Sequence, residues 1–204
     1  MIKARHHWFY VRFFHFYCRF MIHWHFRNVV IKGEVQERGM PVLLIGNHFS
    51  WWDGFFANYL NCKIFRRRFH VMMLEEQLKK YMFLNKAGAY SIRQHTHSVM
   101  ESLKYTRELL KDPANLVTIY PQGEIRSMFH YPVRFEKGIS KILSGMEDKV
   151  QVIFITALVD YLSHRKPSLT LGVKEYQPGK NIDVQDMEHA FNEHMQEMIN
   201  QQKE

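Results

Sequence analysis

The sequence contains few residues that could form covalent cross-links. Only two of its 204 residues are cysteines, Cys18 and Cys62, and no C-x-x-C or zinc-ribbon spacing occurs. This scarcity argues against a disulfide framework and favours a reducing, cytoplasmic setting. The chain also has no internal repeat, no low-complexity segment and no linker rich in Pro or Gly. We therefore expect a single domain with an N-terminal extension.

The N-terminal segment lacks an uninterrupted apolar run. Residues 8–26 contain ten aromatic residues, but Arg12 and Arg19 interrupt them, and no small-residue cleavage site is visible. This pattern argues against a membrane span and against a signal peptide. A helix here would carry one polar stripe, formed by Arg12, His15, Arg19, His23 and Arg27. Most of its remaining surface would be aromatic: Trp8, Phe9, Phe13, Phe16, Phe20 and Trp24. This pattern predicts an amphipathic helix in the headgroup plane of a membrane, and the alternative is a helix packed on the protein's own core.

Acidic residues are fewer than basic ones. The 28 Lys and Arg residues exceed the 20 Asp and Glu residues, which gives a net charge of +8. This charge favours an anionic partner such as a membrane surface, a phosphate-rich ligand or nucleic acid. No helix-turn-helix, zinc-finger or RNP pattern is present, so we expect no nucleic-acid partner. The 13 histidines are scattered and include no H-E-x-x-H motif, so we expect no metal site.

A histidine and an aspartate lie five positions apart in the segment Asn47-His48-Phe49-Ser50-Trp51-Trp52-Asp53. The preceding apolar run, residues 41–45, is typical of a buried strand, and residues 54–60 are typical of a helix. A His at the end of a strand and an Asp in the first turn of the next helix can meet. Such a pair can act as a general base with its orienting carboxylate. The alternative is a capping box, in which Ser50 and Asp53 stabilise the helix start and His48 is an ordinary loop residue.

Apolar runs and periodicity predict alternating strands and helices along the rest of the chain. We expect an edge strand at 29–35 and further strands at 43–46, 71–74, 89–92, 116–120, 150–158 and 169–174. We expect helices at 53–61, 75–84, 96–111, 135–146 and 183–201. The last helix would turn inward Met187, Phe191, Met195 and either Met198 or Ile199. This alternation predicts an α/β fold, a single layered αβα domain with a mixed central sheet, whose ligand-binding loops gather at the carboxyl ends of strands.

Two further motifs follow later strands. Gly88-Ala89-Tyr90-Ser91-Ile92-Arg93-Gln94 ends in an arginine whose planar guanidinium could pair with a phosphate. Tyr120-Pro121-Gln122-Gly123-Glu124-Ile125-Arg126-Ser127 places a glycine after a strand, where the backbone can approach a ligand closely. The alternatives are a solvated strand-end arginine and a simple Pro-Gly turn.

In this order, the three motifs resemble those of the glycerolipid acyltransferases, the family of lysophosphatidic acid acyltransferase and glycerol-3-phosphate acyltransferase. The first is similar to the family's signature of His, four residues and Asp. The second is similar to a block whose Arg holds the phosphate of the acceptor. The third is similar to Phe-Pro-Glu-Gly-Thr-Arg-Ser, with Gln122 in place of the Glu and one extra residue before Arg126. Gln94 stands where some members have a second Arg.

The resemblance, which covers roughly residues 29–160, implies an O-acyltransferase. His48 would take a proton from a hydroxyl of a lysophospholipid-type acceptor as that hydroxyl attacks an acyl thioester, and Asp53 would hold the imidazole. The donor would be acyl-CoA or acyl carrier protein, with no other cofactor and no metal. The acceptor would be bound by Arg93, Gln122, Gly123, Glu124 and Arg126.

The resemblance also implies an organisation and a location. We expect an interfacial helix over residues 1–28 and an acyltransferase domain over residues 29–204, at the cytoplasmic face of a membrane as a peripheral or monotopic protein. Gln94 and Gln122 leave open an acceptor without a phosphate, such as an aminolipid, a glycolipid or a lipid pigment. A catalytically silent membrane-binding homologue is another alternative. The run Arg66-Arg67-Arg68 could meet donor phosphates, an acidic carrier protein or anionic lipid, or it could be a solvated basic loop.

Overall fold

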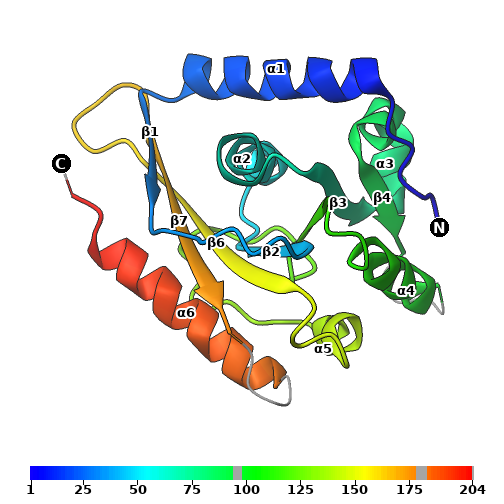
Figure 1. The fold of residues 1–204 in the computed structure, drawn as a ribbon. Coiled ribbons are helices and arrows are strands. Elements are labelled where there is room, and N and C mark those ends of the chain that lie inside the picture. Colours follow the sequence, from blue (N-terminus) through cyan, green and yellow to red (C-terminus); the bar gives the residue numbers. More distant parts are fainter. Residues whose placement is uncertain (94–97, 178–182, 204) are drawn as a thin grey trace.

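The computed structural model of the chain describes residues 1–93, 98–177 and 183–203. A seven-stranded sheet with the order β1-β7-β6-β2-β5-β3-β4 runs through the molecule (Figure 1). The strands are β1 Asn28–Lys32, β2 Val42–Gly46, β3 Arg68–Leu74, β4 Ala89–Ile92, β5 Asn115–Ile119, β6 Gln151–Asp160 and β7 Ser168–Tyr176. Only the β6–β7 pair is antiparallel among these seven strands, so the predicted mixed sheet is confirmed.

The central strands are apolar along their whole length because both faces of the sheet are covered. Every residue of β2 and of β5 is buried, which is the pattern expected of parallel strands between two helical layers. The helices are α1 Trp8–His25, α2 Asp53–Leu60, α3 Glu75–Lys80, α4 Val99–Leu109, α5 Gly138–Leu143 and α6 Val184–Asn200. A π-helical turn, η1 (Asn61–Phe65), follows α2, and a 3-10 turn, η2 (Met82–Ala87), follows α3. Figure 1 shows α2 on one side of the sheet and α5 and α6 on the other, so the predicted αβα fold is confirmed.

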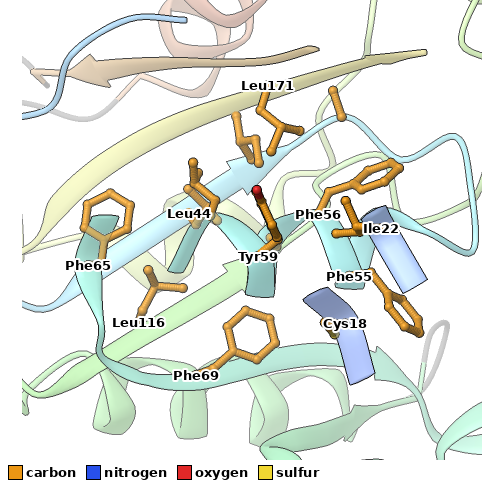
Figure 2. Close-up of a cluster of buried hydrophobic side chains, with 14 of the residues drawn as sticks. Cys18, Ile22, Leu44, Phe55, Phe56, Tyr59, Phe65, Phe69, Leu116 and Leu171 are labelled. Atoms are coloured by element: carbon orange, nitrogen blue, oxygen red, sulfur yellow. The ribbon is translucent and has the colours of Figure 1, made fainter. Parts of the chain in front are cut away.

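Helix α1 lies beyond α2 and shares a core with it. Cys18 and Ile22 of α1 point into one cluster with side chains of α2 and of the sheet (Figure 2). The opposite side of α1 is exposed and carries all six aromatic residues that the sequence placed there: Trp8, Phe9, Phe13, Phe16, Phe20 and Trp24. The helix therefore has one face packed on the protein's own core and an aromatic outer face, and its placement at a membrane surface stays a prediction. No helix in the described ranges is long and apolar enough to cross a membrane.

The segment before α1 is fixed to the sheet. The N–H groups of Arg5 and His7 donate to the carbonyls of Asn85 and Lys86 in η2 at 3.1 and 2.9 Å. The N–H of Ser91 in β4 donates to the carbonyl of Ile2 at 2.9 Å. The division into a helical segment (1–28) and a domain (29–204) stays a prediction, and in the structure the two parts share one core.

Some element boundaries differ from those expected. Strand β3 begins at Arg68 rather than at residue 71, because Arg68 and Phe69 pair with Asn115 and Leu116 of β5. The last residue of the Arg66-Arg67-Arg68 run therefore lies within the sheet. The helix expected over 75–84 ends at Lys80, and that expected over 135–146 is reduced to Gly138–Leu143. The helix expected over 96–111 is observed from Val99 to Leu109, and its expected first residues, 96 and 97, lie outside the described residues.

In α6, Met198 and not Ile199 is the last residue that faces the core. Met198 is 4% exposed and packs over Gly172 of β7, whereas Ile199 is 36% exposed. We expect Met198→Ala to lower the free energy of unfolding by about 2–5 kcal/mol, because it removes buried apolar contacts and leaves a cavity. Ile199→Ala is the matched control and should change it by only about 0.5 kcal/mol. Urea denaturation measures both, and equal losses would contradict this orientation of α6.

Candidate active site

His48 and Asp53 form a hydrogen-bonded pair at the carboxyl edge of the sheet. His48 follows the end of β2, and Asp53 is the first residue of α2. Nδ1 of His48 lies 2.6 Å from Oδ2 of Asp53, and the two side chains are 24% and 2% exposed. The strand–turn–helix connection thus brings together the two residues that the sequence paired.

The Asp53 carboxylate organises the whole connecting turn. Its Oδ2 also accepts hydrogen bonds from the N–H groups of Phe49 and Ser50, at 2.9 and 3.0 Å. Because this oxygen accepts from two backbone donors, it acts as an acceptor toward His48 as well. Nδ1 of His48 therefore carries the proton, and Nε2 is left with a lone pair that can accept one. The capping contacts and the His–Asp pair are thus functions of one carboxylate, so the capping alternative does not exclude the pair.

The charge state of Asp53 reflects two opposing effects. Burial raises the pKa of the Asp53 carboxyl, and the hydrogen bonds from His48, Ser50 and Phe49 oppose that rise. The other oxygen, Oδ1, is buried without a hydrogen-bond partner among the described residues. All of the observed hydrogen bonds to the carboxylate are therefore made to Oδ2.

The imidazole is also held against an aromatic ring. The rings of His48 and Tyr120 are stacked, with centroids 4.5 Å apart and an angle of 17° between their planes. Gly46 makes room for Tyr120, since a Cβ at that position would lie 3.0 Å from the Tyr120 ring. Burial raises the pKa of Tyr120 well above its ordinary value, so its hydroxyl stays protonated. Sequence reasoning placed Tyr120 in the third motif but gave it no part in the site.

Four further hydrogen bonds fix the backbone around His48. Asn47 bridges to β6: its Nδ2 donates to the Ala157 carbonyl at 3.0 Å, and its Oδ1 accepts from the Ala157 N–H at 2.9 Å. The His48 N–H donates to Oε1 of Gln122 at 2.6 Å, and the Arg126 N–H donates to the His48 carbonyl at 3.0 Å. The first and third motifs therefore form one hydrogen-bonded unit.

An apolar cavity of about 420 Å³ opens beside His48. Its walls come from β3, β4, β5, α4 and α5, with side chains such as Met72, Ile92, Val99, Leu103, Ile119 and Ile142. Gln122, Gly123 and Glu124 line the same cavity as His48. A mostly apolar cavity with a few polar groups at one end suits a ligand that has a hydrocarbon part and a reactive polar part.

Arg126 and Arg93 are both engaged with carboxylates. The Arg126 Nε–H donates to Oε1 of Glu124 at 2.8 Å, and the guanidinium also lies 2.9 Å from Nε2 of His130. Arg93, directly after β4, donates to Oε1 of Glu75 at 2.6 Å. The phosphate-binding roles expected for these two arginines stay predictions. Gln94, the other departure from the second motif, lies outside the described residues.

Glu75 was not identified from the sequence, although it directly follows the end of β3 at the same edge of the sheet. Its buried carboxylate accepts from Arg93, from Ser91 Oγ at 3.1 Å and from Lys79 Nζ at 3.2 Å. These partners, the Arg93 guanidinium first, lower the pKa of Glu75 to about 2. Glu75 therefore remains ionised and holds Arg93 in place. In the described ranges, no three His, Cys, Asp or Glu side chains lie close enough together to hold a metal ion.

A solved structure shares the fold of this chain. The chain is similar to the 1-acyl-sn-glycerophosphate (LPA) acyltransferase PlsC from Thermotoga maritima, with a TM-score of 0.63 and 14% sequence identity. The match covers 95% of this chain and 80% of that one. At this identity the likeness shows a shared fold.

The sequence itself gives the family. A family model described as acyltransferase matches residues 28–158, which span all three motifs. The chain belongs to the acyltransferase family, and the resemblance seen in its motifs is confirmed. No curated protein sequence matches it significantly.

The ion pairs of Glu75 predict that the stability of the protein depends on pH in a particular way. A carboxyl with a lowered folded-state pKa adds stability that is present above its ordinary value of 4.5 and is lost as the pH falls toward about 2. We expect Glu75→Gln to be less stable than the unmodified protein at pH 7, and this difference should shrink between pH 5 and pH 2. Urea denaturation at several pH values measures it. Glu76→Gln, at the exposed neighbouring position, is the control, and a difference independent of pH would contradict the ionised state of Glu75.

Proposed function

We propose that the protein transfers an acyl chain from a thioester donor, acyl-CoA or acyl carrier protein, to a hydroxyl of a lysophospholipid-type acceptor. The observation that carries this proposal is the 2.6 Å contact between His48 Nδ1 and Asp53 Oδ2 beside an apolar cavity. It supplies an oriented base next to a space suited to a hydrocarbon chain.

The proposed reaction needs no covalent acyl-enzyme. Nε2 of His48 takes the proton of the acceptor hydroxyl as its oxygen attacks the thioester carbonyl carbon. The carbon–sulfur bond then breaks, and the departing thiolate takes the proton from the imidazolium. Asp53 keeps the imidazole in the required tautomer and stabilises the imidazolium that forms.

Charge on the thioester oxygen needs hydrogen-bond donors. The N–H groups of Phe49 and Ser50 are engaged by Asp53, and that of Trp52 donates to Ser50 Oγ at 3.2 Å. The turn around Gly123, where φ is +71°, is the other candidate for this role; there the Gly123 N–H itself donates to the Tyr120 carbonyl at 3.1 Å. Gln122 accepts from the His48 N–H through Oε1, which leaves its Nε2 as a donor for the acceptor hydroxyl.

The nature of the acceptor depends on the two arginines. A guanidinium has five N–H donors, so Arg93 can bind a phosphate while it stays paired with Glu75. Arg126 already contacts both Glu124 and His130, which favours the alternative of an acceptor without a phosphate near this position. An aminolipid, a glycolipid or a lipid pigment would be of that kind.

The exposed aromatic face of α1 supports action at a membrane surface. Six exposed aromatic side chains beside a basic stripe are typical of a helix that lies in the headgroup region. We propose a peripheral or monotopic association with the cytoplasmic face, where the thioester donors would be available.

The proposed base can be tested by removing it. We expect His48→Ala to lower acyl transfer by about 10²–10⁴-fold, the contribution typical of a general base, with an unchanged fold. Thiol release from acyl-CoA and from acyl carrier protein, measured in detergent with a panel of lysolipids, gives the rate. His189→Ala, which changes an exposed histidine on α6, is the matched control. Near-normal turnover by His48→Ala would rule out this mechanism.

The same panel distinguishes the acceptors. If a phosphate binds at Arg93, Arg93→Gln should raise KM for phosphate-bearing lysolipids about tenfold or more and leave kcat nearly unchanged, because a charge-assisted contact is lost. Glycolipid and aminolipid acceptors should be unaffected. An equal effect on all acceptors would show that Arg93 supports the structure and does not recognise the acceptor.

A further inference from the structure

A second groove lies between α1 and the turn that follows α2. It has a volume of about 920 Å³ and is lined by α1 from His15 to Trp24 and by residues of the segment 61–67. Its walls contain arginines, histidines and aromatic rings, and none of its described lining residues is an Asp or a Glu. A groove with cations and without carboxylates is complementary to an anion.

Two of the lining arginines present their charge to the groove. Arg19 and Arg66 are exposed, and neither has a carboxylate within ion-pair distance among the described residues. The field of Arg19 extends into the groove, where it opposes the rise that burial causes in the pKa of the Cys62 thiol. Arg67 differs, because its guanidinium donates to Glu37 and to the carbonyls of Met40 and Pro113.

The backbone that carries Arg66 is held in an unusual conformation. Arg66 follows the π-helical turn η1 and is left-handed, with φ +53° and ψ +36°, a region that favours glycine. The buried side chain of Asn61 clamps the turn: its Oδ1 accepts from the Arg67 N–H at 3.1 Å, and its Nδ2 donates to the Arg67 carbonyl at 2.9 Å. The turn therefore keeps a cationic side chain at a position where the backbone would be more relaxed with glycine.

The rim of the groove is apolar and faces outward. Phe16, Phe20 and Trp24 line it and are 70%, 51% and 62% exposed. Neighbouring rings along this row are stacked, with centroids 6.4 and 5.8 Å apart. Exposed rings next to guanidinium groups match the boundary between acyl chains and phosphates in a lipid leaflet. A phosphate compound without an aromatic ring or an acyl chain would leave these rings uncovered.

The groove lies at the opposite edge of the sheet from His48. Arg66 and Arg67 immediately precede β3, at the amino end of that strand, whereas His48 follows the carboxyl end of β2. Strands β2, β5 and β3 are parallel to one another, so the two places face opposite ends of the sheet. A lipid in this groove would not be positioned for the reaction.

From these observations we propose that the groove binds the phosphodiester headgroup of an intact anionic phospholipid, with Arg19 and Arg66 on the phosphate and the aromatic row among the acyl chains. The proposal rests on the membrane-surface association proposed above and adds a lipid preference to it. It assigns the exposed cations of the α1–η1 groove to recognition of the membrane, separately from recognition of the substrate.

The test compares binding of the full chain to vesicles of phosphatidylcholine alone and to vesicles that also contain phosphatidylglycerol. We expect tighter binding to the anionic vesicles and a loss of this preference by about 30-fold in the double variant Arg19→Gln/Arg66→Gly, roughly a factor of five for each cation. Arg66→Gly suits the left-handed backbone, so the fold should be kept, and Arg66→Asn serves as a second variant. The control is Arg134→Gln/Lys141→Gln, which removes the same charge from the α5–α6 side of the sheet.

Several results would overturn the proposal. These are equal binding of the unmodified protein to both vesicles, an equal loss of preference in the control, and displacement from anionic vesicles by millimolar glycerol phosphate, which would identify a soluble phosphate compound as the ligand. Acyl transfer in detergent is measured on the same variants and should stay unchanged. Because vesicle binding and transfer are read separately, absence of transfer would disprove the proposed function without affecting the lipid preference.

Discussion

The Oδ2 atom of Asp53 is the acceptor on which the geometry of the candidate site depends. It accepts hydrogen bonds from the side chain of His48 and from the N–H groups of Phe49 and Ser50. These bonds fix the imidazole and the turn that carries it with respect to α2. A carboxylate in this position is costly to bury, and three donors on one oxygen offset part of that cost. The turn and the base are therefore held by the same atom.

The surroundings of this pair are set by small and uncharged residues. Gly46 allows Tyr120 to lie beneath the imidazole, and Asn47 continues the pairing of β2 with β6 through its side chain after the backbone has turned away. Gln122 holds the backbone of His48 from the side of β5. Three neighbouring strands, β5, β2 and β6, thus hold one histidine, and the rigidity of the central sheet is transmitted to it.

The sequence predicted the elements of the fold well because its signals there are local. Continuous apolar runs marked β2, β5 and β6, and 3.6-residue periodicity marked α1 and α6. The start of β3 was missed because Arg68 is placed in the sheet by pairing with Asn115, 47 positions away. The buried side of α1, with Phe14, Cys18 and Ile22, was also missed, since aromatic residues lie all around this helix and only tertiary contact shows which of them are covered.

In the site, spacing predicted the meeting of His48 with Asp53, because both belong to one strand–turn–helix connection. The ion pair between Arg93 and Glu75 joins two different strand ends, and no local pattern in the sequence indicates it. The same is true of the contact between Gln122 and His48. The sequence therefore indicates which chemically capable residues lie at one edge of the sheet. It does not indicate which of these residues pair with each other.

The shared core of α1 and α2 has a geometric consequence. Phe26, just past the end of α1, contacts Trp52, the residue before Asp53, with ring centroids 5.6 Å apart, and Phe14 contacts Phe55 in the first turns of α2. Helix α1 is therefore packed rigidly against the rest of the domain and does not move independently of it. When the outer face of α1 rests on a surface, that contact sets the tilt of the whole sheet. The imidazole of His48 then lies at a constant height and angle above the surface.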